Sequence, residues 1–160
     1  TQRAILGDVV AALYLQGIRK LIIVNGHGGN SFKNMIRDLS VDFPDFLIAI
    51  TNWYGIVPQE GYFENKDDHA GELETSVMMY YHPELVNLEE AGEGTSKPFA
   101  LSSLNAQIAW LPRYWSKVSA DTGIGDPRKS TPEKGERYAK AVIEKLALLF
   151  TEIGSKEVYL

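Results

Sequence analysis

None of the 160 residues in the sequence is a cysteine. This absence excludes disulfide bonds and thiolate chemistry, so any bound metal must be held by His, Asp or Glu side chains. A protein without disulfides is typical of the cytoplasm, where we expect this one. No apolar run approaches the roughly 20 residues of a membrane span, and the first residues lack the pattern of a signal peptide. We therefore expect no membrane partner.

The sequence also lacks a cluster of basic residues. Its 16 lysines and arginines are scattered and the formal net charge is −5, which together argue against nucleic-acid binding. A small-molecule substrate or a protein partner fits this charge distribution better. The length of 160 residues and the hydrophobic content of 44% predict a single globular domain with an ordinary core.

Hydrophobic spacing predicts an α/β order in the first third of the chain. Residues 1–17 have the spacing of an amphipathic helix, which Gly17 closes in the left-handed conformation. Residues 20–25 and 46–52 are apolar runs without alternation, as in parallel strands covered on both faces. The segment between them predicts a helix with Asn30 or Ser31 as its N-cap. These elements form a βαβ unit with a right-handed crossover.

The rest of the chain predicts two helices and one segment that could be either a helix or a strand. After a long aromatic loop at residues 53–68, a helix runs from about Gly71 to Tyr81. Residues 99–119 are apolar and aromatic, and their pattern fits a strand and a helix equally well. The last helix has Thr131 as its cap and Pro132 at its first position. Its buried stripe is expected to contain Tyr138, Val142, Leu146, Leu149 and Ile153.

The turn "NGHGGN" at residues 25–30 follows the first strand, at the sheet edge where α/β proteins bind ligands. A phosphate loop would need G-x-G-x-x-G or a lysine after the glycines, and neither is present. A metal site would use the imidazole of His27, since the flanking glycines let an ion or substrate approach closely. The third alternative is a solvated histidine in an ordinary turn.

The stretch "DDHAGELETS" at residues 67–76 combines one histidine with four acidic residues at a loop-to-helix junction. His69 and Glu72 are three positions apart and can share a helix face, whereas Glu74 points elsewhere. Helix capping and the helix dipole explain the acidic residues but not the histidine. His82, at the end of the same helix, is interpreted as structural because a histidine is favoured there.

Together with "GIGDPRKSTPEKGE" at residues 123–136, these motifs resemble the creatininase family. The resemblance implies a three-layer α/β/α sandwich around a mainly parallel sheet, and homo-oligomers that are often hexamers. It also implies hydrolysis of a C–N bond in a cyclic amide or formamide. The implied cofactors are divalent metal ions, Zn, Mn or Fe, with two ions in a complete site.

The resemblance also implies roles for individual residues. His27 corresponds to a histidine ligand of the metal, His69 to the catalytic histidine, and Asp68 to the acid beside it that orients it. Trp53 corresponds to a tryptophan that walls the substrate pocket. The predicted substrate-binding residues are Trp53 and three residues of the turn, Gly28, Gly29 and Asn30.

Two departures from the family pattern modify this prediction. Creatininase itself has a metal-binding glutamate where this chain has Gly29, and we expect Glu72 to replace it as a ligand. Glu74 is expected to support the site through hydrogen bonds to His27 or to the turn backbone. A flap tryptophan of creatininase aligns near Asn65, which argues against creatinine as the substrate.

The remaining metal ligands of the family, a Glu-x-His pair and an Asp, are expected upstream of residue 1. We therefore predict that residues 1–160 form one creatininase-like domain that lacks an N-terminal segment. Two alternatives stay open at this point: an inactive, creatininase-like binding protein and a nucleotide-binding α/β domain.

Overall fold

The computed structural model describes residues 1–65 and 68–159. It divides into two compact units. One unit combines Thr1–Val57 with Val142–Leu160, and the other consists of Pro58–Ala141. The first is called the sheet unit and the second the loop unit. The prediction of one domain stays a prediction.

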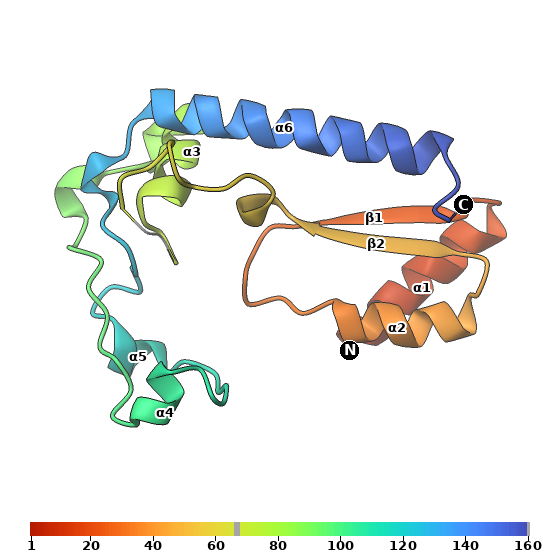
Figure 1. Ribbon diagram of the computed structural model, residues 1–160, viewed down its shortest axis with the longest axis horizontal. Coiled ribbons are helices and arrows are strands. Elements are labelled where there is room, and N and C mark those ends of the chain that lie inside the picture. Colours follow the sequence, from red (N-terminus) through yellow and green to blue (C-terminus); the bar gives the residue numbers. More distant parts are fainter. Residues whose placement is uncertain (66–67, 160) are drawn as a thin grey trace. The chain divides into compact units, whose positions relative to one another are not determined.

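The sheet unit contains the predicted βαβ arrangement. It consists of α1 (Gln2–Leu15), β1 (Lys20–Asn25), α2 (Lys33–Asp42), β2 (Leu47–Asn52) and the last part of α6 (Pro132–Ser155). The two strands are parallel, with Lys20 opposite Leu47 and Asn25 opposite Asn52. Figure 1 shows α1 and α2 on one side of these strands and α6 on the other. The predicted parallel α/β/α architecture is therefore confirmed.

The core of the sheet unit lies between the strands and the first two helices. Val10, Leu39, Phe46 and Ile48 are buried there and contact one another. Gly17 closes α1 at a φ of 84°, as predicted, because this left-handed conformation carries no Cβ penalty in glycine. The strands are less covered than expected: Val24 of β1 is 45% exposed.

The start of α2 differs from the prediction. Its N-cap is Phe32, and no side chain caps the helix. Asn30 does not cap it, since its amide group donates a hydrogen bond to Asn25 Oδ1 within the turn. The polar residues after the glycines therefore shape the turn, and the helix begins later than predicted.

The loop unit contains α3 (Glu72–Tyr81), α4 (Ser102–Asn105), α5 (Trp115–Val118) and the start of α6. Residues 99–119, for which the sequence favoured neither helix nor strand, thus hold two helices of one turn each. Short 3₁₀ helices lie at Pro83–Leu85, Leu88–Glu90 and Pro127–Lys129, and a further one, Trp53–Gly55, lies in the sheet unit. None of the helices in the described residues is both long and apolar enough for a membrane span.

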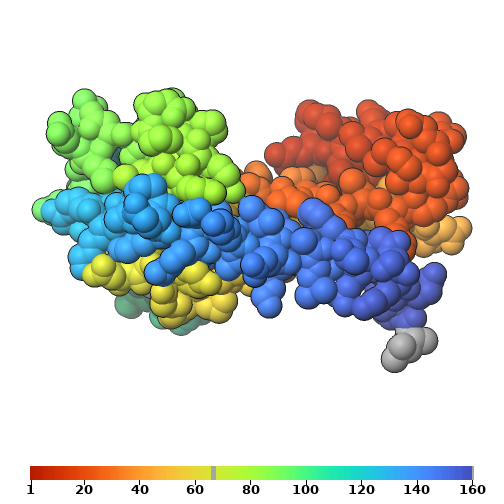
Figure 2. Space-filling model, turned by 90° about the horizontal axis from the view of Figure 1, so that it is seen from above, coloured from red at the N-terminus to blue at the C-terminus, as the bar shows by residue number. Residues whose placement is uncertain are grey.

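Helices α3 and α6 pack closely within the loop unit. A Cβ added at Gly135 would lie 1.9 Å from the carbonyl oxygen of Ser76, so only glycine fits at this contact. Thr131 caps α6 as predicted, because its Oγ1 accepts the Lys134 N–H at 3.2 Å. Figure 2 shows the atoms of α3, in light green, against the first turns of α6, in blue. The predicted α6 stripe is confirmed, with Tyr138 and Val142 buried and its other members partly buried.

Candidate active site

The glycine turn, residues 25–30, is organised by the side chain of Asn25, which is only 3% exposed. Its Nδ2 donates to the His27 carbonyl at 2.9 Å and to Asn52 Oδ1 at 2.8 Å. Its Oδ1 accepts the His27 N–H and the amide of Asn30. A buried amide with both ends bonded fixes the path of the backbone. The sequence analysis missed this role, although a polar residue ending an apolar strand is a usable signal.

His27 lies at the exposed tip of the turn. The Gly29 N–H donates to His27 Nδ1 at 3.0 Å, so a neutral ring in this geometry carries its proton on Nε2. A Cβ at position 29 would lie 2.9 Å from the ring, which explains why glycine follows here. Ligation of a metal through Nε2 therefore requires the proton to move to Nδ1 and the Gly29 contact to break.

The other predicted substrate-binding residues lie around the same turn. The indole N–H of Trp53 donates to the carbonyl of Gly26 at 3.2 Å. A Cβ at Gly28 would lie 3.6 Å from the hydroxyl oxygen of Tyr54, so the 3₁₀ helix packs against the glycines. The structure thus gathers Trp53, Gly28, Gly29, Asn30 and His27 within the sheet unit. Their binding role stays a prediction.

The α3 junction, residues 68–74, belongs to the loop unit. The backbone of His69 pairs with that of Ile124 through hydrogen bonds of 2.8 and 2.9 Å. Ala70 then adopts a φ of 51°, a conformation that non-glycine residues rarely take. Glu74 Oε2 accepts the Ala70 N–H at 2.7 Å and so stabilises this turn. Asp67 of the predicted motif lies outside the described residues.

The imidazole of His69 has a carboxylate and an aromatic ring near it. Its Nδ1 lies 3.9 Å from Glu74 Oε2, and its ring centroid lies 5.0 Å from that of Trp115. The Asp68 carboxylate forms a two-fold ion pair with the guanidinium of Arg113. Arg113 in turn lies over the Trp115 ring, 5.6 Å from its centroid. Trp115 and Arg113 come from the ambiguous segment, so the sequence analysis missed both.

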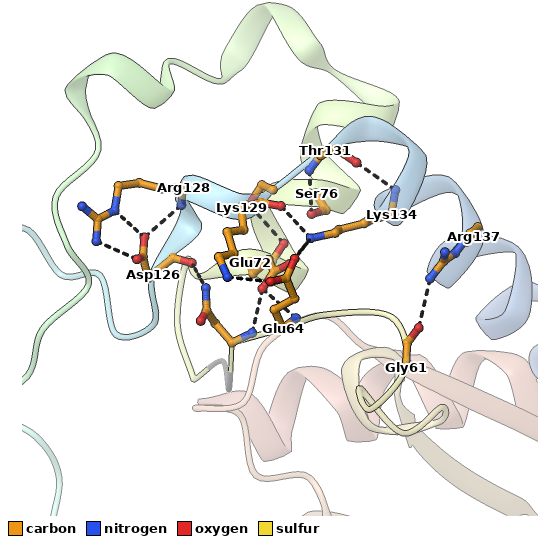
Figure 3. A network of polar contacts seen from close by, with 12 residues as sticks. Gly61, Glu64, Glu72, Ser76, Asp126, Arg128, Lys129, Thr131, Lys134 and Arg137 are labelled. Carbon is orange, nitrogen blue, oxygen red and sulfur yellow. Dashed lines mark hydrogen bonds and ion pairs between the residues drawn. The ribbon is translucent and has the colours of Figure 1, made fainter.

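Glu72 has no exposed surface, and Figure 3 shows its carboxylate at the centre of a polar network. One oxygen accepts the backbone N–H groups of Glu64 and Asn65, at 3.0 and 2.8 Å. The other accepts from Lys134 Nζ at 2.6 Å. Both oxygens of this predicted metal ligand are therefore engaged, and its role as a ligand stays a prediction.

The electrostatics of this network follow from the paired charges. The hydrogen bond to Glu72 raises the pKa of Lys134, although burial opposes the shift. Lys129 lowers the pKa of Glu64, with a further contribution from Lys134. Nearby, Arg128 lowers the pKa of Asp126 to about 2. Lys134, Glu64 and Asp126 therefore keep their charges throughout the physiological pH range.

Histidine and carboxylate side chains are suitable ligands for Zn²⁺, Mn²⁺ or Fe²⁺. Within residues 1–65 and 68–159, however, no group of three or more such side chains lies together as a metal site would require. The described residues by themselves therefore do not fit a complete metal centre. The prediction that His27 and Glu72 share a cation stays a prediction.

Parallel strands with helices on both faces define an α/β protein, with a glycine turn after β1 and a histidine before α3. The family model Creatininase, described as creatinine amidohydrolase, matches residues 1–150. The chain belongs to the creatininase family.

Relatives of known name extend this result. The chain is 30% identical over 129 residues to the mycofactocin precursor peptide peptidase of Mycobacterium ulcerans (strain Agy99), covering 78% of the chain and 45% of that protein. It is 22% identical over 156 residues to the creatinine amidohydrolase of Pseudomonas putida, covering 88% and 58%. The chain thus spans about half the length of these curated relatives.

A solved structure is similar over the whole chain. It is a candidate creatinine amidohydrolase from Bacteroides fragilis NCTC 9343, with 61% identity and a TM-score of 0.96. The match covers 100% of this chain and 64% of that one. This likeness supports the described arrangement of helices and strands.

Proposed function

We propose that the protein is a metal-dependent hydrolase that cleaves a C–N bond in a small cyclic amide or formamide. The observation that carries the proposal is the placement of Glu74 beside His69 at the start of α3, in a chain of the creatininase family. The peptidase and the amidohydrolase among the relatives are both named for the hydrolysis of an amide C–N bond.

In the proposed reaction, the oxygen of a water molecule adds to the carbonyl carbon, the C–N bond breaks, and the proton that the water loses replaces the one that His69 gives away. His69 donates the proton that the departing nitrogen needs, since an imidazole works well as a general acid near neutral pH. Glu74 is proposed to help position this ring, because its carboxylate lies 3.9 Å from Nδ1. Asp68 is proposed to help orient His69, with its own carboxylate held by Arg113.

Two divalent ions, Zn, Mn or Fe, are proposed for the complete site. Solved creatininases include a Zn-Zn form and a Mn form, which supports this choice. When bound, such ions provide an acidified water molecule and polarise a carbonyl group. His27 and Glu72 are the proposed ligands from this chain, and the incomplete ligand set means that no reaction step is assigned to the metal.

The surroundings of the site complete the proposal. Trp53, Gly28, Gly29 and Asn30 are proposed to contact the substrate, because they surround His27. The working protein is proposed to be a cytoplasmic homo-oligomer, with hexamers as the form common in the family. Creatinine itself is not the proposed substrate.

The test uses the full-length protein with a panel of lactams and formamides, together with a measurement of bound metal. We expect hydrolysis of at least one compound, with bound divalent metal. Since general acid catalysis contributes about 10²- to 10⁴-fold, His69→Ala should lower kcat by at least 100-fold. Glu74→Gln should lower kcat by a smaller factor and shift its pH profile.

His82→Ala is the matched control, because His82 lies at the far end of α3 and pairs with Glu84 at 3.2 Å. Its kcat should equal that of the wild type. Absence of hydrolysis across the panel with metal present would favour the inactive binding protein. Stabilisation by nucleotides in a thermal-shift assay would favour the nucleotide-binding domain.

A further inference from the structure

A cavity lies in the loop unit, next to the α3 junction. Its volume is about 160 Å³, which is enough for a small organic group together with water. Phe99, Val118 and Ile124 contribute apolar lining, and Asp68, Lys97 and Arg113 are its charged lining residues. These six residues define what is called the side cavity. Neither the family resemblance nor the proposed mechanism assigns it a role.

The charge of the side cavity is opposite to that of the chain. Two cations and one anion line it, whereas the formal net charge of the whole sequence is −5. Asp68 neutralises Arg113, with which it forms an ion pair. In the part of the chain that the structure describes, Lys97 forms no ion pair. The cavity therefore attracts a negatively charged group.

Arg113 is suited to bind that group directly. A guanidinium has five N–H donors, and the contacts with Asp68 use its two terminal nitrogens. Each terminal nitrogen keeps one further N–H and Nε keeps its own, and these three coplanar donors suit a carboxylate better than a point charge does. Trp115, over which Arg113 lies, limits the directions that the guanidinium can take.

The lining residues of the side cavity are linked to the proposed catalytic histidine through the backbone and through Trp115. Ile124, in its lining, is the residue whose backbone pairs with His69. Asp68, also in the lining, directly precedes His69 in the sequence. Arg113 and His69 both contact Trp115. If the scissile bond of a substrate lies at His69, a short substituent on that substrate can therefore reach the side cavity.

We infer that the side cavity is a subsite for a carboxylate, bound by Lys97 and Arg113, and that the substrates are small amides or lactams bearing this group. The inference rests on the proposed function for the position of the scissile bond. The recognition of the carboxylate itself rests on the two cations and on the cavity.

A pair of lactams that differ only in charge tests this inference. The full-length protein is assayed with 5-oxoproline and with 5-oxoprolinamide, in which a neutral carboxamide replaces the carboxylate. We expect kcat/KM to be at least ten-fold higher for 5-oxoproline. Lys97→Gln and Arg113→Gln should each raise KM for 5-oxoproline at least ten times more than KM for the carboxamide. Only Lys97→Gln is expected to leave kcat nearly unchanged, because Arg113 also holds the Asp68 carboxylate.

Two further variants make the result specific. Lys117→Gln removes an exposed lysine that lies near Tyr114 and outside the cavity lining, and it should leave both KM values unchanged. Arg113→Lys should recover part of the preference, because it restores the charge without the planar donors. Equal kcat/KM values for the two lactams in the wild type would overturn the inference, even if Arg113→Gln proves unstable.

A binding experiment separates this inference from the proposed function. Cyclopentanecarboxylate and cyclopentanecarboxamide cannot be hydrolysed as lactams, and their affinities are measured by NMR chemical-shift titration. Tighter binding of the carboxylate that Lys97→Gln abolishes supports the subsite, even if no lactam is hydrolysed. Hydrolysis without any preference for the carboxylate in either experiment overturns the subsite and leaves the proposed function standing.

Discussion

The glycine turn and the α3 junction both present a histidine, but they are held in different ways. The turn is fixed by neutral amides around Asn25, and His27 lies exposed at its tip. The junction is fixed by charges, with the carboxylate of Glu72 fully buried against Lys134. Neutral hydrogen bonds can be exchanged for water at little cost, whereas a buried charge cannot lose its partner cheaply. We therefore expect the loss of one partner to destabilise the junction more than the turn.

The largest expected effect comes from Lys134→Met, which leaves the Glu72 carboxylate buried without its cation. Breaking one side of a buried ion pair lowers the free energy of unfolding by about 3–5 kcal/mol. Urea unfolding monitored by tryptophan fluorescence measures this loss. Lys129→Met is the control, because Lys129 contacts Glu64 at an exposed position, where solvent screens the ion pair and its removal changes stability little.

Glu72→Gln tests whether the carboxylate of the same pair is a metal ligand. If Glu72 is a metal ligand, this change lowers the metal content of the full-length protein. If its carboxylate serves only to hold Lys134 and the loop at residues 64–65, metal content stays at the wild-type value while stability falls. Unchanged stoichiometry would therefore rule out ligation by Glu72.

Two glycines sharpen the comparison further. A Cβ at Gly135 would lie 1.9 Å from the backbone of Ser76. This steric clash is relieved only if α3 and α6 move apart. We expect Gly135→Ala to cost about 3 kcal/mol, at the upper end of usual overpacking effects. A Cβ at Gly29 meets only the ring of His27, which can rotate. Gly29→Ala should thus cost less than about 1 kcal/mol.

Thermal unfolding of the two variants measures this difference, and NMR of the His27 ring checks its cause. Gly29→Ala should abolish the hydrogen bond from the residue 29 N–H to Nδ1. Equal losses of stability in the two variants would contradict the view that the turn tolerates an added methyl group better than the contact between α3 and α6.

Much of the fold could be predicted because its signals are local. The apolar runs of β1 and β2 and the Thr131–Pro132 start of α6 depend on neighbouring residues, and all three are found where expected. The predicted N-cap of α2 was wrong because Asn30 forms a hydrogen bond with Asn25 across the turn, and the spacing of residues does not reveal this contact. Local pattern predicts an element better than it predicts which side chain ends it.

The candidate site was less predictable because its contacts join distant segments. Lys134 and Glu72 are 62 positions apart, and Arg113 and Asp68 are 45 apart. Lys134 shares the exposed charge pattern of an ordinary helix start, so nothing in its neighbourhood marks it as a buried partner. The motif around His69 was visible in the sequence, but the residues that hold it were not.

Asn25→Ala tests whether the turn depends on one amide. The substitution removes four hydrogen bonds of a buried side chain and should cost about 1–2 kcal/mol. Hydrogen exchange should rise most at the His27 and Asn30 amides and little in α3. Asn34→Ala is the control, since the exposed Asn34 amide accepts a hydrogen bond from Arg37 on the surface of α2. A uniform rise across the chain would contradict a local role.

The smallest effect at neutral pH is expected from Tyr138→Phe, in α6 next to the junction. Burial raises the pKa of Tyr138 from 10.0 to about 12, so the phenol favours the folded state fully below pH 10 and loses this contribution between pH 10 and 12. Wild-type stability should therefore fall more steeply across that window than the stability of Tyr138→Phe, as urea midpoints at successive pH values would report. Tyr159→Phe is the matched control, because it removes the hydroxyl of a tyrosine that is 89% exposed. Parallel pH slopes for the wild type and Tyr138→Phe would mean that the phenol ionises without disturbing the contact between α6 and the loop unit.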